Sequence, residues 1–207
     1  MPGSDRVPDV DQVTLPVRGA GGASWPSVSG DDWSARVPRL FAPASVEYAN
    51  VDLGFTTGPF DDALVSRLHL VAITGPGELI VCTTEQAWRF LPGGTREPEE
   101  SLHELVVREL LEEAGAVPVD DELTLFGAHV ADSRDPEPWR PHLAFPRALW
   151  AYGACRAEIT GPPTCPPDGE QIVDVLTMPA EDAVEFMETT DPMMADAVRL
   201  AIAMGLV

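Results

Sequence analysis

Three glutamates stand close together near the end of one strongly helical segment. Residues 93–117 read GGTREPEESLHELVVRELLEEAGAV. In this segment Glu109, Glu112 and Glu113 occupy positions i, i+3 and i+4, which share an arc of roughly 100° on one helix face. Like charges at this spacing repel one another, and the last turn of a helix disfavours anions because of the helix dipole. The pattern therefore predicts either arginine partners or a bound cation.

Further oxygen donors precede the helix. Glu97 and Glu100 lie in the preceding loop, and a Pro-Gly-Gly turn leaves the Gly93 carbonyl accessible. Carboxylate and carbonyl oxygens are the ligands that Mg²⁺ and Mn²⁺ prefer. Such ions neutralise charge on a phosphoryl group and orient an attacking water. The alternative interpretation is a solvated acidic face, which is common in a chain this acidic.

The limits of this helix are marked in the sequence. Ser101 followed by Glu104 forms the S-x-x-E pattern of a capping box. Gly115 stands where a left-handed residue ends a helix. These signals predict a helix over residues 102–114 that carries all three glutamates.

The same segment resembles the Nudix box, which would span Gly94–Ala116. The matching positions are Gly94, Glu100, Arg108, Glu109, Leu110, Glu112, Glu113 and Gly115. Two positions depart from the family's usual form. Ala116 replaces a larger aliphatic residue, and Glu99 occupies a loop position that glycine often holds. Neither departure removes a carboxylate of the box.

The resemblance implies roles for these residues. Glu109, Glu112 and Glu113 would ligate divalent cations, Mg²⁺ or Mn²⁺, with the Gly93 carbonyl as a further ligand. Arg108 would orient a box glutamate through an ion pair. Glu100 would support the loop or contact metal through water. The base that activates the water stays open between a helix glutamate and a carboxylate of a later loop, for which Asp168 and Glu170 are the candidates.

The resemblance also implies the fold: an α+β Nudix fold in which a mixed β-sheet is sandwiched between helices, with an N-terminal extension. Residues 1–45 are rich in Pro, Gly and Ser and are expected to form an arm, and residues 46–207 the domain. Hydrophobic patterning predicts strands near 46–55, 68–74, 78–84, 123–132, 148–159 and 171–178. It predicts a short helix over 61–67 and two closing helices over 179–188 and 191–204.

Residues outside the box are expected to recognise the substrate. Arg89 and Arg96 flank the Pro-Gly-Gly turn and could reach phosphates. The loop 132–147 holds Arg134, Trp139 and Arg140, a basic and aromatic cluster in which Trp139 could stack on a nucleobase. Surface ion pairs and an aromatic anchor for the loop are the alternative interpretation of the same residues.

Charge and composition exclude several function classes. The chain of 207 residues has 34 acidic and 13 basic residues, all of the latter arginine, and a net charge of −21. Such an anion does not bind nucleic acid or an anionic membrane non-specifically. No apolar run approaches the roughly 18 residues of a membrane span. With three unpatterned cysteines and no signal-peptide pattern, a cytoplasmic protein is expected.

Three functions follow from these residues. The first is a metal-dependent pyrophosphohydrolase acting on a nucleoside diphosphate linked to another moiety, with a small-molecule diphosphate as its partner. The second is a non-catalytic Nudix-fold sensor of a nucleotide or other metabolite, which the intact box disfavours. The third is a hydrolase of a non-nucleotide diphosphate such as a prenyl diphosphate. An aromatic arm exchanged between subunits would make the protein a homodimer.

Overall fold

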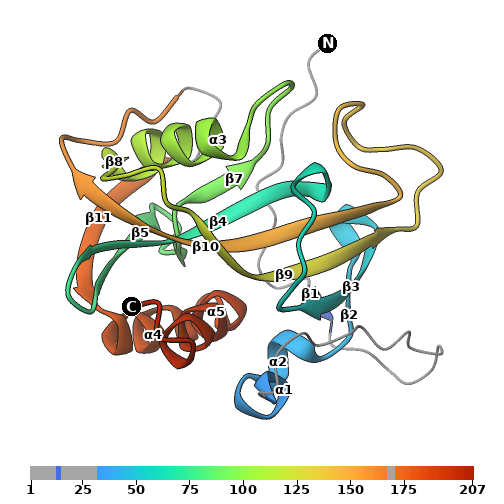
Figure 1. The fold of residues 1–207 in the computed structure, drawn as a ribbon, viewed down its shortest axis with the longest axis horizontal. Coiled ribbons are helices and arrows are strands. Elements are labelled where there is room, and N and C mark those ends of the chain that lie inside the picture. Colours follow the sequence, from blue (N-terminus) through green and yellow to red (C-terminus); the bar gives the residue numbers. More distant parts are fainter. Residues whose placement is uncertain (1–12, 15–31, 167–170) are drawn as a thin grey trace.

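The computed structural model describes residues 13–14, 32–166 and 171–207. In this part of the chain one mixed β-sheet lies between helices on its two faces (Figure 1). This arrangement confirms the α+β fold expected from the sequence. Asp168 and Glu170, the two candidate bases of the later loop, lie outside the described residues, as does most of the predicted N-terminal arm.

The central strands of the sheet are long, and two of them are parallel. Strand β4 (Val65–Gly75) pairs in parallel with β10 (Arg147–Ile159) and antiparallel with β5 (Glu78–Thr84). The sheet order is β1-β2-β3-β9-β10-β4-β5-β11, and the remaining members are β1 (Val13–Thr14), β2 (Ala44–Val46), β3 (Val51–Thr56), β9 (Thr124–Ser133) and β11 (Ile172–Pro179). Short strands β6 (Arg89–Phe90), β7 (Gly93–Thr95) and β8 (Ala116–Pro118) pair with β5, β4 and β10.

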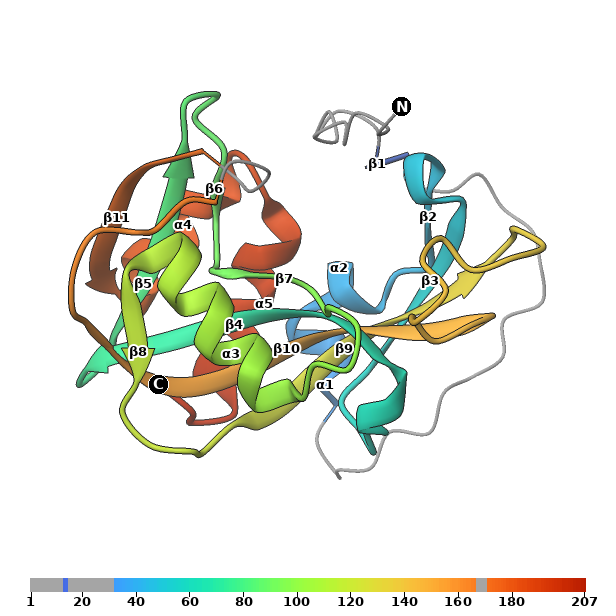
Figure 2. The same cartoon turned by 90° about the horizontal axis from the view of Figure 1, so that it is seen from above.

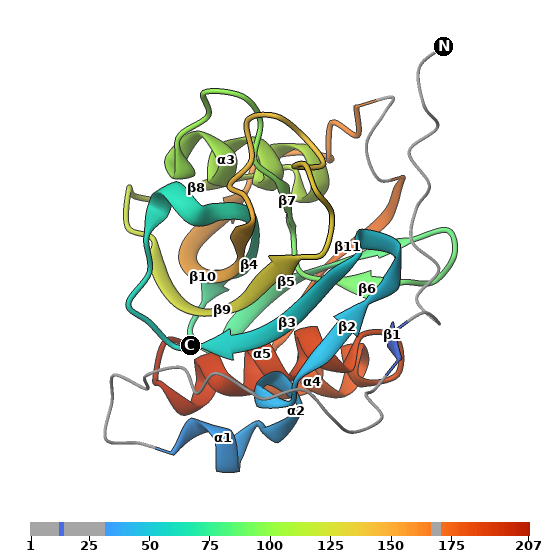
Figure 3. The same cartoon turned by 90° about the vertical axis from the view of Figure 1, so that its right-hand side faces the viewer.

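Helices cover both faces of this sheet. Helix α3 (Leu102–Glu109) crosses one face above β4 and β10 (Figure 2). Helices α4 (Ala180–Glu188) and α5 (Pro192–Ala203) cover the other face, and the short helices α1 (Trp33–Arg36) and α2 (Pro38–Phe41) lie on the same side (Figure 3). None of the helices in the described part of the chain is long and apolar enough to span a membrane.

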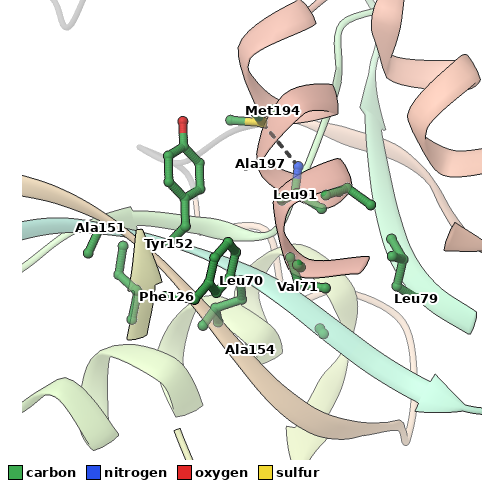
Figure 4. Packing of buried hydrophobic residues seen from close by; sticks show 14 of the residues in the cluster. Leu70, Val71, Leu79, Leu91, Phe126, Ala151, Tyr152, Ala154, Met194 and Ala197 are labelled. Carbon is green, nitrogen blue, oxygen red and sulfur yellow. Dashed lines mark hydrogen bonds between the residues drawn. The ribbon is translucent and has the colours of Figure 1, made fainter. Parts of the chain in front are cut away.

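Buried aliphatic and aromatic side chains join the sheet to α5. Leu70 and Leu79 are fully buried, and Tyr152 projects from β10 toward the side of the sheet that α5 covers (Figure 4). The Leu91 N–H donates to the sulfur of Met194. Burying one large aliphatic side chain contributes about 1.5–3 kcal/mol, so these contacts hold the α5 layer against the strands that lead to the site.

Two predicted elements differ from the structure. The strand expected over 46–55 is split by a 3₁₀ turn at Glu47–Ala49, after which Asn50 has a φ of 49°, so β2 and β3 form a hairpin. The helix expected over 61–67 is only a 3₁₀ turn at Asp62–Leu64. Strand β4 begins at Val65 because that residue already pairs with Leu149 of β10 and is buried.

The described part of the predicted arm packs on the domain. Trp33, Val37 and Leu40 belong to the main hydrophobic core and are at most 8% exposed. Strand β2 extends the sheet from its pairing with β3. That residues 1–12 and 15–31 form an arm remains a prediction. The segment 32–46, by contrast, packs on the domain through its buried side chains.

Candidate active site

A capping box begins the helix that carries the glutamates. The Ser101 hydroxyl accepts the Glu104 N–H at 3.2 Å, and the Glu104 carboxylate accepts the Ser101 N–H at 2.8 Å. Each side chain thus satisfies a backbone donor that the first turn leaves free. The helix begins at Leu102, as the sequence predicts.

The end of this helix is a π-turn, which the sequence does not predict. The α-helical part ends at Glu109, and Leu110–Ala114 continue with π geometry before Gly115, which has a φ of 58°. Residues of the connection after β10 take up carbonyls of this turn: the Thr164 N–H donates to Leu111 and the Cys165 N–H to Glu112, at 3.2 and 3.1 Å. Because these donors from outside the helix pair with the carbonyls of Leu111 and Glu112, the wider turn leaves neither carbonyl without a hydrogen bond.

Two of the three glutamates are buried against the Gly93-Gly94 turn. Glu109 and Glu113 are 5% and 7% exposed. The Gly93 N–H donates to Oε2 of Glu113 at 2.8 Å. At Gly94 a Cβ atom would lie 2.8 Å from Cδ of Glu109, so only glycine lets this carboxylate approach the strand. The turn and the helix therefore fit together through these two glycines.

Arg108 joins the helix to the loop before it. Its Nε and Nη2 donate to the two oxygens of Glu100 at 2.7 and 3.0 Å, a bidentate pair. Its Nη1 donates to Glu109 at 2.6 Å and contacts Glu112 at 3.3 Å. Its Nη2 also donates to the Thr95 carbonyl at 3.1 Å. One cation thus contacts three of the carboxylates singled out from the sequence.

Burial and Arg108 shift the pKa values of these carboxyl groups in opposite directions. Burial raises the pKa of Glu109 to about 7, although Arg108 acts to lower it. Burial also acts to raise the pKa of Glu100, but hydrogen bonds from Arg108 and from the Glu97 N–H leave that pKa below its ordinary value. The ionised form of Glu109 would therefore be stabilised by a nearby cation.

The donor set fits a hard divalent cation. Glu109, Glu112 and Glu113 offer carboxylate oxygens next to the Gly93-Gly94 turn, which is the ligand type that Mg²⁺ and Mn²⁺ prefer. In the described residues no three acidic, His or Cys side chains converge as a complete metal-binding group. Arg108 and the Gly93 N–H instead hold the Glu109 and Glu113 oxygens. The chemistry fits, and binding would require these oxygens to turn toward the ion.

The predicted substrate-binding arginines have different surroundings. Arg96 donates to the carbonyls of Glu100 and Asp62 at 2.5 and 2.9 Å and lines a cavity of about 320 Å³ beside the box loop. Arg89 donates to the Phe186 carbonyl at 2.8 Å and stacks on that ring. The structure therefore places Arg96 in the box loop and holds Arg89 against α4.

The loop between β9 and β10 contacts the box loop through some of its predicted residues. Arg140 pairs with Glu97 at 3.1 Å and lies 4.5 Å from the centre of the Trp139 ring, which is 68% exposed. Arg134, the first residue of this loop after β9, instead pairs with Glu47 at 3.4 Å. Trp139 and Arg140 are thus linked to the box loop, and Arg134 is not.

The contact between Arg67 and Trp150 is not predictable from local sequence. Arg67 lies on β4 opposite Thr95 of β7, and its guanidinium carbon is 5.3 Å from the centre of the Trp150 ring. A single arginine in the strand SRLHLVAIT gives no local signal of its neighbours. The pairing of β4 with β10 places Arg67 opposite Trp150, on the sheet face away from Glu109.

Comparisons with known proteins found one matching family and several similar solved structures. The family model described as NUDIX domain matches residues 67–198. Among similar solved structures, a mutant of the Bacillus subtilis pyrophosphohydrolase BsRppH is 17% identical, with a TM-score of 0.45 over 63% of this chain and 73% of that chain. An ADP-ribose pyrophosphatase from Streptococcus suis is 16% identical, with a TM-score of 0.38 over 66% of this chain and 90% of that chain. Nothing among curated proteins matches the chain.

Proposed function

The chain belongs to the Nudix family, enzymes that hydrolyse phosphoanhydride bonds, and from this we propose that it is a metal-dependent pyrophosphohydrolase. Its substrate is a nucleoside diphosphate linked to another moiety. Water attacks one phosphorus of the P–O–P bridge, the bridging P–O bond breaks, and two phosphate-bearing products leave. No covalent enzyme intermediate is required.

One observation supports this proposal above the others: the buried pair Glu109 and Glu113 lies against the Gly93-Gly94 turn, with Arg108 bridging helix and loop. A solvated acidic face, the alternative interpretation, would leave these carboxylates in water. Arg108 and the Gly93 N–H hold these carboxylates at the turn, and burying two carboxylates side by side is costly even with such partners. Their convergence at the box therefore supports a functional cation site.

Glu109, Glu112, Glu113 and the Gly93 carbonyl would hold Mg²⁺ or Mn²⁺. When bound, this ion would neutralise phosphate charge and lower the pKa of a water. Arg108 orients Glu109 by their 2.6 Å contact, and Glu100 fixes Arg108 by accepting two of its N–H groups. The base is one of the helix glutamates, or Asp168 or Glu170 of the later loop.

Residues of the neighbouring loops would bind the rest of the substrate. Arg96 lies in the box loop, and the segment that carries Arg140 contacts that loop. Trp139 offers an exposed ring beside Arg140. Arg89 and Arg134 would have to leave their present partners to reach a phosphate, which makes them weaker candidates.

A cytoplasmic protein with a small-molecule substrate agrees with the chain's charge of −21. This charge opposes binding to nucleic-acid polymers and to anionic membranes. A homodimer built through the N-terminal arm remains a prediction.

Release of a nucleoside monophosphate and of the second phosphate-bearing product (pyrophosphate or phosphate from a nucleoside triphosphate) from a panel of substrates tests the function. The panel contains nucleoside triphosphates, ADP-ribose, NADH, sugar nucleotides, dinucleoside polyphosphates and prenyl diphosphates, each with Mg²⁺ and with Mn²⁺. We expect metal-dependent turnover of at least one nucleoside diphosphate derivative, reduced by several orders of magnitude in Glu113→Gln. Binding of a nucleotide without turnover of any panel member would contradict an enzyme and favour the sensor.

A further inference from the structure

Two of the chain's three cysteines contact the π-turn that carries Glu112 and Glu113. Cys82 is fully buried on β5, and its Sγ–H donates to the Glu113 carbonyl at 3.4 Å. Cys165 is partly exposed in the connection after β10, and its backbone N–H donates to the Glu112 carbonyl at 3.1 Å. Since these carbonyls belong to consecutive residues, the turn brings together two cysteines that are distant in the sequence.

The two thiols are close enough to influence each other. Burial raises the pKa of the Cys82 thiol, and the charges of Glu113 and Cys165 act in the same direction. A small reagent in solution can reach Cys165, whereas Cys82 is 0% exposed. The third cysteine, Cys155, is buried on β10 opposite Ala72 of β4. Cys82 and Cys165 thus form a pair with one accessible and one buried thiol.

Cys165 is held in a conformation that its sequence disfavours. Its φ is 41°, which lies in the left-handed region where a Cβ atom is crowded by the backbone. Pro166 follows it, and a residue before proline favours an extended backbone. The hydrogen bond from the Cys165 N–H to the Glu112 carbonyl opposes both preferences. A competing bond at Cys165 would therefore be helped by the release of this strain.

We propose that Cys82 and Cys165 are a site of reversible oxidation, at which a peroxide joins them in a disulfide. The Cys165 sulfur attacks one peroxide oxygen, the O–O bond breaks, and a sulfenic acid and one water form. The Cys82 sulfur then attacks the Cys165 sulfur, the S–O bond breaks, and the departing hydroxyl takes the Cys82 proton as a second water. Two thiols are oxidised and one peroxide is reduced. In reducing compartments, disulfides of this transient kind are usually catalytic or redox-sensing.

The disulfide changes the support of the π-turn. It removes the hydrogen that Cys82 donates to the Glu113 carbonyl. Drawing Cys165 toward β5 also takes its N–H away from the Glu112 carbonyl. Because Glu112 and Glu113 extend from this turn, oxidation weakens the binding of a divalent cation and slows hydrolysis. These two effects rest on the proposed function, whereas formation of the bond does not.

Treatment of the full chain with hydrogen peroxide tests the site. After the peroxide is removed, part of the sample is denatured, alkylated at its remaining thiols, digested and mapped by mass spectrometry. Mn²⁺ binding by calorimetry, and the rate with any substrate that the reduced protein hydrolyses, are measured on the rest. Cys165→Ser keeps the backbone donor to Glu112 and removes the accessible thiol. Cys82→Ser, whose hydroxyl can still donate to the Glu113 carbonyl, is the second variant, and Cys155→Ser is the matched control.

We expect one disulfide in the oxidised wild type, between the peptides of Cys82 and Cys165, with the Cys155 thiol still alkylated. Oxidation lowers the Mn²⁺ affinity and the rate at least ~fivefold, as is typical when hydrogen bonds at a site are lost, and dithiothreitol restores both. Cys165→Ser and Cys82→Ser keep the values of the reduced protein after peroxide treatment. Cys155→Ser responds to peroxide as the wild type does.

Three results would overturn the assignment. These are a Cys82 thiol that is still alkylated after peroxide treatment, a disulfide between the Cys165 residues of two molecules, and a Cys82–Cys165 disulfide that leaves the Mn²⁺ affinity unchanged. Mapping and calorimetry need no turnover. A disulfide that weakens Mn²⁺ binding in a protein without any hydrolysis would therefore leave this inference standing while the proposed function fails.

Discussion

Glycines and one strained glutamate determine how closely the box loop approaches its helix. Gly94 admits the Glu109 carboxylate because it has no Cβ. Glu99 has a φ of 64°, a left-handed conformation that costs roughly 1–2 kcal/mol for residues other than glycine. This conformation explains why the family often has glycine there. Glu99 thus changes the charge of the loop while the backbone keeps the glycine geometry.

At the residue scale, His129 makes the stability of the protein depend on pH. Burial lowers the pKa of His129 to about 4, so below its ordinary pKa of about 6.5 the unfolded chain binds a proton that the folded chain does not. Its contribution is complete above pH 6.5 and is lost as the pH falls toward 4. Between pH 7.5 and 5 the loss amounts to about 2 kcal/mol.

Guanidinium unfolding at pH 7.5 and at pH 5 checks this prediction. We expect His129→Phe, which keeps a ring against Phe55 at this position, to lose about 2 kcal/mol less than the wild type between the two pH values. His103→Phe is the control, because that side chain is half exposed on α3. An identical pH dependence for the wild type and His129→Phe would contradict a neutral, buried His129.

Part of the site follows from local sequence and part does not. The spacing of Glu109, Glu112 and Glu113 and the cap at Ser101 are local patterns, so the helix start and its acidic face are predictable. The approach of Glu109 and Glu113 to the Gly93-Gly94 turn is not, because it depends on the pairing of β7 with β4, whose residues are distant in the chain. The ion pairs of Arg134 also come from tertiary structure, which the composition of its loop cannot specify.

At the element scale, the π-turn and the segment Thr160–Cys165 form one unit. Backbone N–H groups of Thr160 and Gly161 donate to the Gly115 carbonyl, next to those that reach Leu111 and Glu112. Local sequence predicts an α-helix to residue 114 because helix signals do not include donors that lie 45 to 53 residues later in the chain. Since the turn carries Glu112 and Glu113, this segment holds the backbone from which those two carboxylates extend.

Gly115→Ala tests that unit against Gly77→Ala. Both glycines have positive φ, 58° and 72°, so each alanine costs roughly 1–2 kcal/mol in backbone conformation. At Gly115 the new Cβ would also lie 2.6 Å from the Pro162 carbonyl carbon, whereas at Gly77 it meets nothing within 4 Å. Overpacking of this kind adds a further ~1–3 kcal/mol.

Thermal unfolding and metal-dependent rate are measured for both variants. We expect Gly115→Ala to lower the melting temperature more than Gly77→Ala does. We also expect only Gly115→Ala to reduce the metal-dependent rate. Equal melting temperatures and equal rates would show that the contact with residues 161–162 does not position the turn.

At the scale of the whole molecule, Arg39 ties the N-terminal segment to the C-terminal helices. From α2 it forms bidentate pairs with Asp196 of α5, at 2.7 and 2.8 Å, and with Glu188 of α4, at 2.6 and 2.9 Å. The Asp196 side chain is 4% exposed. Arg199 also contacts both carboxylates. Residues assigned to an arm on composition alone are thus fastened to the far end of the chain.

Arg39→Met therefore leaves the buried Asp196 with Arg199 as its main partner. Removing one member of a buried pair destabilises strongly, and with one arginine remaining we expect a loss of about 2–3 kcal/mol. The control Arg134→Met removes exposed pairs to Glu47 and Asp52 and should cost at most about 1 kcal/mol. Urea unfolding measures both, and equal losses would contradict a buried network at α2.

The central claim is that the box glutamates support metal-dependent hydrolysis. It is tested most directly by the initial rate of Mg²⁺-dependent product release in the double variant Glu112→Gln/Glu113→Gln. The control Glu104→Gln removes a charge from the same helix while glutamine can still cap it. We predict a loss of at least ~1,000-fold, equivalent to about 4 kcal/mol of transition-state stabilisation, for the double variant and near wild-type rates for the control. A folded double variant with undiminished Mg²⁺-dependent turnover would contradict the account.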